Sequence, residues 1–275
     1  MADARPIGIF DSGFGGLTVS RAIIDLLPGE DTVYFGDTGR YPYGPRPLDE
    51  VAGFAHEIAA HLVADHDVKF LVVACNTASA AVELPELEAA IGVPVIGVID
   101  PGARALVEVT ETGRIGVIGT VGTIGSGAYQ KAIAGLAGGD SVELTSAACP
   151  GFVEFVERGK FSGDQITVLA ERLLAPVVDA DVDSLLLGCT HYPYLARTIG
   201  AVMGPKVVLV SSADETAFAV AARLEAEGLT SGRIEGGAHR FESSGDVAWF
   251  ADLGRRLLGP ELGSADSHIW QPPSA

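Results

Sequence analysis

Short apolar runs alternate along this chain with segments of helical spacing, and this alternation limits the fold more than any other feature. The runs cover residues 7–10, 32–35, 70–74, 94–99, 114–118, 141–144, 185–187 and 206–210. Helical spacing covers residues 17–27, 48–65, 80–90, 165–178 and 216–227. The runs lack a clean apolar–polar alternation, which is typical of strands buried on both faces of a parallel sheet. We therefore predict an α/β protein with doubly wound, mainly parallel sheets.

Two pairs of segments are alike and follow in the same order, which indicates an internal repeat. Residues 6–13 resemble 114–121, and residues 69–77 resemble 183–191. We expect two pseudo-symmetric α/β domains with an active site in the cleft between them. The strand at 206–210 and the helix after it are left over from the second unit, so we assign them to a returning segment. The predicted limits are 1–100 plus 209–275 for the first domain and 101–208 for the second.

The ends of the chain and its net charge limit where in the cell the protein is expected and which partners it is expected to bind. The start lacks the features of a signal peptide, and no apolar stretch approaches the ~20 residues that cross a membrane, so we expect a cytoplasmic protein. The tail from about Gly259 is rich in Gly, Ser and Pro and should fray, although Trp270 could dock. With 18 Lys+Arg against 36 Asp+Glu, the net charge of -18 disfavours nucleic acid and membranes. We expect a small-molecule substrate, held by amides, hydroxyls and helix N-termini.

Motifs for cofactors and metals are missing. Thr18 stands where a dinucleotide fingerprint needs its third Gly, and neither a G-x-x-x-x-G-K-[ST] loop nor a G-x-S-x-G elbow occurs. Cys75, Cys149 and Cys189 are odd in number and have no C-x-x-C spacing, so neither a disulfide framework nor a zinc ribbon is indicated. We expect no cofactor and no metal.

Polar residues follow four of the apolar runs directly, where open α/β sheets bind ligands. These strand ends are residues 11–12, 75–77, 119–120 and 189–191. Cys75 and Cys189 each open a predicted helix, where exposed amides favour a thiolate. Two thiols at matching places of two similar domains could act on opposite faces of one carbon, one removing a proton and the other delivering one. Such a reaction inverts a stereocentre.

Structural roles remain open for several of these residues. Asp11 could cap a helix or form an Asx turn, and His191 could be a surface or capping residue. Cys149 precedes Pro-Gly and has no counterpart in the first unit, so a buried structural thiol is the simpler interpretation. The aromatic and Pro-containing loop 37–45 is a surface turn or, as its rigidity favours, a binding loop.

Four motifs of the chain resemble those of the cofactor-independent glutamate racemases. They are GIFDSGFGGLTV at 8–19, YPYG at 41–44, ACNTAS at 74–79 and GCTHYP at 188–193, and the similarity extends from residue 7 to roughly 255. The resemblance implies two pseudo-symmetric α/β domains and interconversion of L- and D-glutamate by two cysteines. It also implies a supply of D-glutamate for peptidoglycan synthesis and cell-wall biogenesis. We further expect a homodimer.

The same resemblance implies a role for each site residue. Cys75 and Cys189 would form the acid/base pair, Cys75 acting on D-glutamate and Cys189 on L-glutamate. Asp11 would assist near Cys75, and His191 near Cys189. The implied substrate contacts are Ser12, Tyr43, Gly44, Asn76, Thr77, Thr120 and Thr190.

An acidic residue follows the A-C-P motif in this family, and here residues 149–157 offer two candidates. The spacing favours Glu157 over Glu154 as a catalytic residue. Gly151 and Glu154 stand where apolar or Pro residues are expected, which leaves the geometry of this loop and the role of either Glu open.

Three other functions remain open. An aspartate racemase of the same superfamily would more often have Cys-Thr-Glu where this chain has Cys-Thr-His at 189–191. A non-catalytic regulatory protein could keep the fold, but both cysteines are intact. A thiol redox protein would need the Cα atoms of Cys75 and Cys189 within about 7 Å.

Overall fold

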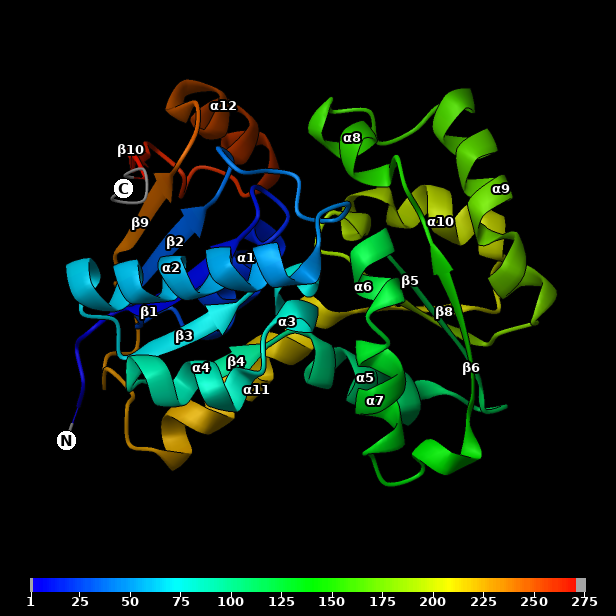
Figure 1. The fold of residues 1–275 in the computed structure, drawn as a ribbon, viewed down its shortest axis with the longest axis horizontal. Coiled ribbons are helices and arrows are strands. Elements are labelled where there is room, and N and C mark those ends of the chain that lie inside the picture. Colours follow the sequence, from blue (N-terminus) through cyan, green and yellow to red (C-terminus); the bar gives the residue numbers. More distant parts are fainter. Residues whose placement is uncertain (1, 271–275) are drawn as a thin grey trace.

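The computed structural model describes residues 2–270, which form two parallel β-sheets flanked by helices. The strands are β1 (Ile7–Asp11), β2 (Thr32–Gly36), β3 (Phe70–Val73), β4 (Val95–Gly97), β5 (Arg114–Gly119), β6 (Glu143–Ala148), β7 (Ser184–Gly188), β8 (Val208–Ser211), β9 (His239–Ser243) and β10 (Asp266–Ser267). The first sheet has the order β10-β9-β2-β1-β3-β4 and the second the order β6-β5-β7-β8. Figure 1 shows the two sheets side by side. All pairings are parallel, and the predicted fold class is confirmed.

The two sheets share one strand order, as the internal repeat predicts. The order β2-β1-β3-β4 in the first sheet corresponds to β6-β5-β7-β8 in the second, and β9 and β10 extend only the first. The strand expected at 206–210 is β8, and it pairs with β7 in the second sheet rather than returning to the first. The limits of 1–100 plus 209–275 and 101–208 stay a prediction, and β8 places the crossing between the sheets after Ser211.

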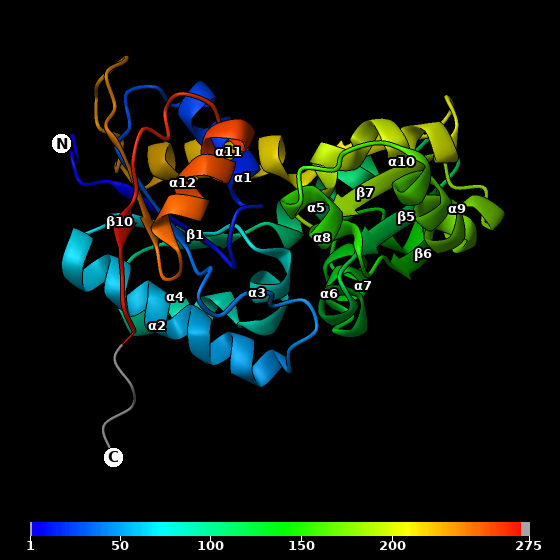
Figure 2. The same cartoon turned by 90° about the horizontal axis from the view of Figure 1, so that it is seen from above.

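Helices cover both faces of each sheet, as Figure 2 shows for the first. One face of the first sheet carries α1 (Leu17–Leu26), α11 (Ser212–Ala226) and α12 (Val247–Leu257), and the other carries α2 (Leu48–His66), α3 (Asn76–Ala81) and α4 (Leu84–Ile91). The second sheet has α5 (Ile99–Val109) and α7 (Ala128–Ala134) on one face and α8 (Phe152–Glu157), α9 (Asp164–Asp179) and α10 (Ala196–Met203) on the other. Ile9 and Phe10 of β1 enter opposite cores, so the strands are apolar throughout. No helix among residues 2–270 is long and apolar enough to cross a membrane.

The helix expected at 80–90 is two helices in the structure. Val82 and Glu83 are extended between α3 and α4, and Pro85 lies in the first turn of α4. Because proline pre-sets a helical φ and its missing N–H costs no hydrogen bond in a first turn, Pro85 fits a fresh helix start at this point.

The tail does not fray within the described residues. β10 pairs in parallel with β9, and the Trp270 ring packs 5.5 Å from the Phe35 ring. The indole Nε1 of Trp270 donates a hydrogen bond of 3.0 Å to Asp37, and the Arg40 guanidinium lies 4.1 Å from the indole ring. These contacts offset the entropy that a Gly- and Ser-rich tail loses on ordering.

Candidate active site

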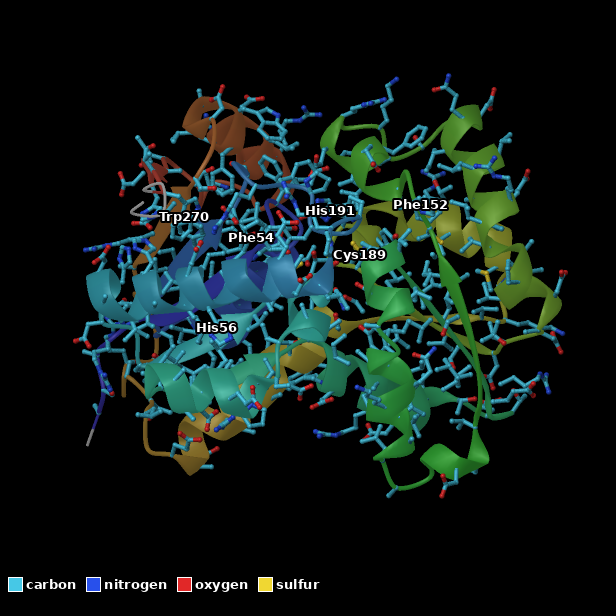
Figure 3. All side chains as sticks on the ribbon, in the orientation of Figure 1. Phe54, His56, Phe152, Cys189, His191 and Trp270 are labelled. Atoms are coloured by element: carbon cyan, nitrogen blue, oxygen red, sulfur yellow. The ribbon has the colours of Figure 1, made fainter. Side chains whose placement is uncertain are left out.

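A pocket of about 100 Å³ lies where the carboxyl ends of the two sheets face each other. Its wall contains Ser12, Tyr43, Gly44, Cys75, Asn76 and Thr77 from the first unit and Thr120, Cys189, Thr190 and His191 from the second. Figure 3 shows Cys189 and His191 where the two halves of the molecule meet. Asp11 and Glu157 lie behind the wall rather than in it. The fold thus gathers the predicted residues around one cavity.

Cys75 is buried directly after β3, where it caps the N-terminus of α3. Its Sγ accepts a hydrogen bond of 3.5 Å from the backbone N–H of Ala78. Burial and the nearby charge of Asp11 nevertheless raise the pKa of Cys75 to about 12, against the weaker effect of the Ala78 amide. The expected thiolate is therefore a neutral thiol at neutral pH, because burial outweighs one turn of exposed amides.

Asp11 connects the first unit to the second. It is fully buried at the end of β1, and its Oδ2 accepts a hydrogen bond of 2.8 Å from the backbone N–H of Gly13. Its Oδ1 accepts one of 3.2 Å from the hydroxyl of Thr190, which follows β7. Asp11 therefore forms the expected Asx-type turn and also carries a negative charge next to Cys75.

Cys189, His191 and Glu157 form a chain of contacts on the other side of the pocket. Cys189 Sγ lies 3.9 Å from His191 Nδ1, and His191 Nε2 lies 3.1 Å from Glu157 Oε1. Burial favours the neutral imidazole, but hydrogen bonds with Cys189 and Glu157 raise the pKa of His191 to about 10. At neutral pH the ring is a cation between a sulfur and a carboxylate, a position suited to holding a proton for Cys189.

The structure separates the two acidic candidates of α8. Glu157 contacts His191 and stands behind the wall, whereas Glu154 lies in the pocket wall itself. The local turn is made by Gly151, whose φ of 95° is in the left-handed region that favours glycine. That turn starts α8 and brings both carboxylates to the cleft.

Asn76 and the threonines around it join the two units through polar contacts. Asn76 Nδ2 donates a hydrogen bond of 2.7 Å to the Tyr129 hydroxyl, and Thr77 Oγ1 lies 3.0 Å from Thr120 Oγ1. Within residues 2–270, the Oδ1 of Asn76 is buried without a hydrogen-bond partner. A buried carbonyl of this kind is costly unless a ligand satisfies it, so Asn76 has an open acceptor for a bound ammonium group.

Tyr43 and Gly44 belong to the pocket wall, as predicted, but their contacts there could not be predicted from the sequence. The phenol of Tyr43 donates a hydrogen bond to Asp37, so its hydroxyl is already engaged, and its ring packs 5.5 Å from Phe54. Gly44 lies against Thr120, and a Cβ at Gly44 would be 3.0 Å from the Thr120 Cβ. Both residues therefore shape the cavity wall.

Several wall residues were absent from the sequence-based set. They are Tyr41, Pro42, Pro45, Val121, Cys149, Pro150, Gly151, Val153 and Tyr192, and Glu154, the alternative to Glu157, joins them. The aromatic loop 37–45 and the YPYG motif at 41–44 were the signals pointing to Tyr41. Cys149 is a third buried thiol, and burial followed by the charge of Cys189 raises its pKa to about 12. It has no counterpart in the first unit, so the repeat could not place it.

Comparison with known proteins decides the family. Residues 7–220 match the family model described as Asp/Glu/Hydantoin racemase. The chain belongs to this racemase family. A glutamate racemase of Parafrankia sp. is 54% identical over 258 residues, which are 94% of this chain and 92% of the relative. The resemblance carried by the four sequence motifs is confirmed.

Solved racemases share the fold over nearly the whole chain. The glutamate racemase isoform RacE1 of Bacillus anthracis has a TM-score of 0.90 and 41% identity, covering 98% of this chain and 99% of that one. The glutamate racemase of Francisella tularensis in complex with D-glutamate has a TM-score of 0.87 and 31% identity, covering 98% of both chains. The two-sheet architecture is therefore that of glutamate racemases.

Proposed function

We propose that this chain interconverts L- and D-glutamate without a cofactor and that Cys75 and Cys189 transfer the protons. Glutamate racemisation is the activity of its close relatives. The observation that carries the mechanism is the position of the two thiols, one from each sheet, on the wall of a single pocket. A carbon held between them offers one face to each sulfur.

Racemisation of L-glutamate starts with Cys189. The His191 cation, held by Glu157, already carries the proton and pairs with the thiolate of Cys189, which removes the proton from Cα. The Cα–H electron pair stays on carbon as a carbanion, and the thiol of Cys75 delivers its proton to the opposite face. The product is D-glutamate, with Cys189 protonated and Cys75 ionised. The reverse reaction runs through the same states in the opposite order.

Substrate charge supports the ionised form of Cys75. The ammonium group of glutamate binds where the wall residue Asn76 has an open Oδ1, and the charge of Asp11 acts on it from behind the wall, as it acts on Cys75. A cation there offsets the charge of Asp11 and lowers the pKa of Cys75 from its value in the free pocket. Binding the correct amino acid thus prepares the second acid/base group.

The two substrate carboxylates are held by neutral groups. Among the described residues, the pocket wall contains neither Lys nor Arg, in line with the acidic composition. Ser12, Thr77, Thr120 and Thr190, four residues with hydroxyl groups, are part of the cavity wall. Fixed donors of this type stabilise the charge that moves onto the carboxylate as Cα loses its proton.

Cysteine substitutions test the proposal. Cys75→Ser and Cys189→Ser should each lower kcat by at least about 10³-fold, because serine is a much poorer base at neutral pH. Cys149→Ser is the matched control, since it alters a third buried thiol of the same wall, and it should lose less than about tenfold. Racemisation by circular dichroism and folding by thermal unfolding are measured on all three. Full activity in either of the first two variants contradicts the mechanism.

Competing functions have distinct outcomes in the same assays. Glutamate and aspartate differ by one methylene, worth about 1–3 kcal/mol in a pocket, so kcat/KM for both amino acids decides the substrate. We expect a preference for glutamate. If neither glutamate nor aspartate is racemised, a regulatory binding protein is favoured. A redox role would require Cys75 and Cys189 to join in a disulfide, whereas all three cysteines are free in the structure.

Three wider properties belong to this proposal. The D-glutamate product would serve peptidoglycan synthesis, which depletion of the protein in cells tests through loss of cell shape. Three buried free thiols suit the reducing cytoplasm, and cell fractionation tests that location. The expected homodimer is tested by light scattering on the purified chain.

A further inference from the structure

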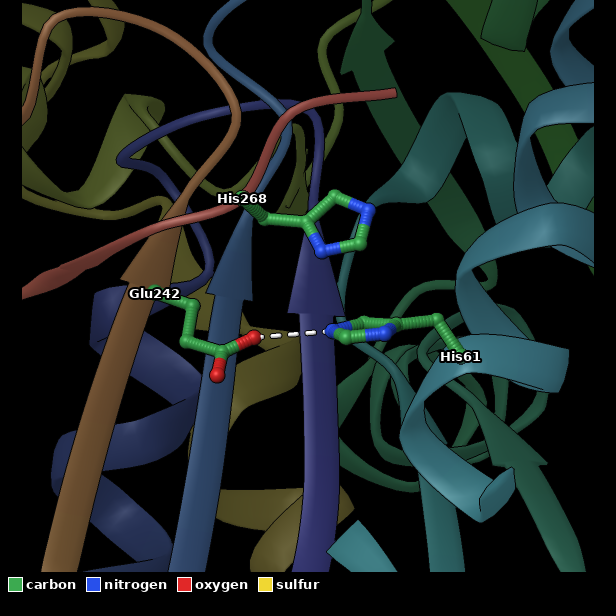
Figure 4. A group of neighbouring side chains, drawn as sticks. All are labelled: His61, Glu242 and His268. Atoms are coloured by element: carbon green, nitrogen blue, oxygen red, sulfur yellow. Dashed lines mark hydrogen bonds and ion pairs between the residues drawn. The ribbon is translucent and has the colours of Figure 1, made fainter. Parts of the chain in front are cut away.

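We propose that His61, Glu242 and His268 form a binding site for a divalent transition-metal ion, with Zn²⁺ as the best match. One ligand atom from each residue lies within 4.8 Å of the other two. The three come from α2, from β9 and from the segment after β10, and they meet beside the first sheet, as Figure 4 shows. None of them lies in the wall of the active-site pocket.

The geometry of the three side chains is close to that of a metal site. His61 Nε2 and Glu242 Oε2 are 2.8 Å apart, and one ring nitrogen of His268 faces this pair in Figure 4. Zinc bonds of about 2.0–2.2 Å in a tetrahedron separate their ligands by about 3.3–3.5 Å. Side-chain rotations therefore suffice to open the His61–Glu242 contact and to bring His268 into place. Two imidazoles and one carboxylate are a donor set that zinc prefers.

His61 and Glu242 make further polar contacts of the kind that hold metal ligands in place. His61 Nδ1 lies 2.8 Å from Asp65 Oδ2, one helical turn further along α2. A ring N–H donated to a carboxylate orients the imidazole, and a metal at Nε2 takes the place of the proton that this nitrogen shares with Glu242, which is released to solvent. The other oxygen of Glu242 lies 2.8 Å from His66 Nε2, so the carboxylate is held at both ends.

Aromatic rings form one wall of the site. The Trp270 ring lies 4.4 Å from the His268 ring, and Phe35 lies 5.4 Å from both His61 and His268. His61 and Glu242 are largely buried, with 8% and 12% of their side chains exposed. An apolar wall beside nearly buried donors limits competition from water for the ion.

The proposed ion would connect segments that are far apart in the sequence. β10 has only two residues, and His268 follows it directly. A metal bound by His268 would tie this short tail to α2 and β9, and an ion that binds only the folded chain raises its thermal stability. A search for short metal motifs could not detect the site because its ligands are at 61, 242 and 268.

Cobalt and zinc titrations of the chelator-treated full-length chain test the proposal. We expect one Co²⁺ to bind per chain. Its visible absorption spectrum should be that of cobalt bound by nitrogen and oxygen atoms, and the near-ultraviolet charge-transfer band of a cobalt thiolate should be absent. Zn²⁺ should displace the Co²⁺ and raise the unfolding temperature. Absence of binding, or a thiolate band that places the ion at the active-site cysteines, overturns the proposal.

Matched variants locate the ion. His268→Ala and Glu242→Gln should each weaken Zn²⁺ binding by at least about 100-fold, and Asp65→Asn by about tenfold, the range found when ligand-supporting groups are removed. His56→Ala is the control, because His56 is an exposed residue of the same helix, as Figure 3 shows, and should bind Zn²⁺ as the native chain does. Racemase activity verifies that each variant is folded. Equal affinity in His268→Ala and His56→Ala contradicts the assignment.

Discussion

Gly15 packs against Thr190 and His191 of the second unit, and under the proposed mechanism a methyl group there should damage catalysis. A Cβ built on Gly15 would lie 2.1 Å from Thr190 Oγ1 and 2.4 Å from His191 Nδ1. Ordinary van der Waals contact requires about 3.5 Å, so both side chains must shift by roughly 1 Å. Thr190 donates a hydrogen bond to Asp11, beside Cys75, and His191 contacts Cys189, so the shift reaches the surroundings of both proposed proton-transfer groups.

A displacement of this size has a predictable cost. Misplacing catalytic groups by ~1 Å lowers the rate by about 10²-fold, and overpacking lowers the free energy of unfolding by about 1–3 kcal/mol. We therefore expect Gly15→Ala to remain folded at 25 °C and to lose about 10²-fold in kcat/KM for L-glutamate. Circular dichroism follows racemisation, and urea denaturation gives the free energy of unfolding.

Gly13→Ala is the matched control for this prediction. It places a methyl group in the same loop, where the nearest atoms would be on Tyr41 at 3.6 Å and Thr38 at 3.7 Å, both ordinary contacts. The backbone N–H that Gly13 donates to Asp11 is retained. Gly13→Ala should therefore keep nearly native kcat/KM. If the two variants have the same activity, close contact across the cleft does not position the catalytic groups.

Two further predictions concern stability. Partial burial raises the pKa of Asp183, but hydrogen bonds from Thr110 and Thr112 outweigh it and hold that pKa below its usual range. The stability that the ionised carboxylate contributes is thus present above about pH 4 and is lost as the pH falls. Asp183→Asn should therefore lower the free energy of unfolding by about 1.5–3 kcal/mol at neutral pH and by less in acid. Urea denaturation at the two pH values measures both differences. Lys69 Nζ lies 2.6 Å from the buried carboxylate of Glu30, and Lys69→Met leaves that carboxylate without its ion-pair partner. The variant should lose about 3–5 kcal/mol of unfolding free energy, part of which a second substitution, Glu30→Gln, restores. A Lys69→Met chain as stable as the native chain would contradict this.

The sheets could be predicted because their signal is local. Strands such as β1 and β3 are buried on both faces, so their apolar runs were visible without any tertiary information. Polar residues at their carboxyl ends then indicated where a ligand binds. Cys75 and Cys189 could be paired because the same pattern occurs twice and the two sheets have the same strand order.

Contacts between distant segments could not be predicted. The partner of His191 is Glu157, 34 positions away, and spacing alone left Glu154 as an alternative. The phenol of Tyr43 is engaged by Asp37, which the sequence gives no means of seeing. Trp270 docks because Arg40 and Asp37 meet it on the folded surface, although the composition around it predicts a frayed tail.

The pKa of Cys75 illustrates a second limit. A cysteine that begins a helix predicts a thiolate if only the exposed amides are considered. Whether burial outweighs those amides depends on how completely the neighbouring elements cover the sulfur, and here the side chain is 4% exposed. Asp11, 64 positions earlier in the chain, adds a charge of the same sign.

The most direct test of the central claim follows deuterium at Cα while L-glutamate racemises in D₂O without added cofactor. Two thiols on opposite faces predict that, early in the reaction, D-glutamate formed carries deuterium at Cα while the remaining L-glutamate keeps its proton. Proton NMR of the separated enantiomers measures both. Deuterium that appears in the remaining L-glutamate as fast as in the product would show that one group serves both faces, and it would contradict the assignment of Cys75 and Cys189 as a pair.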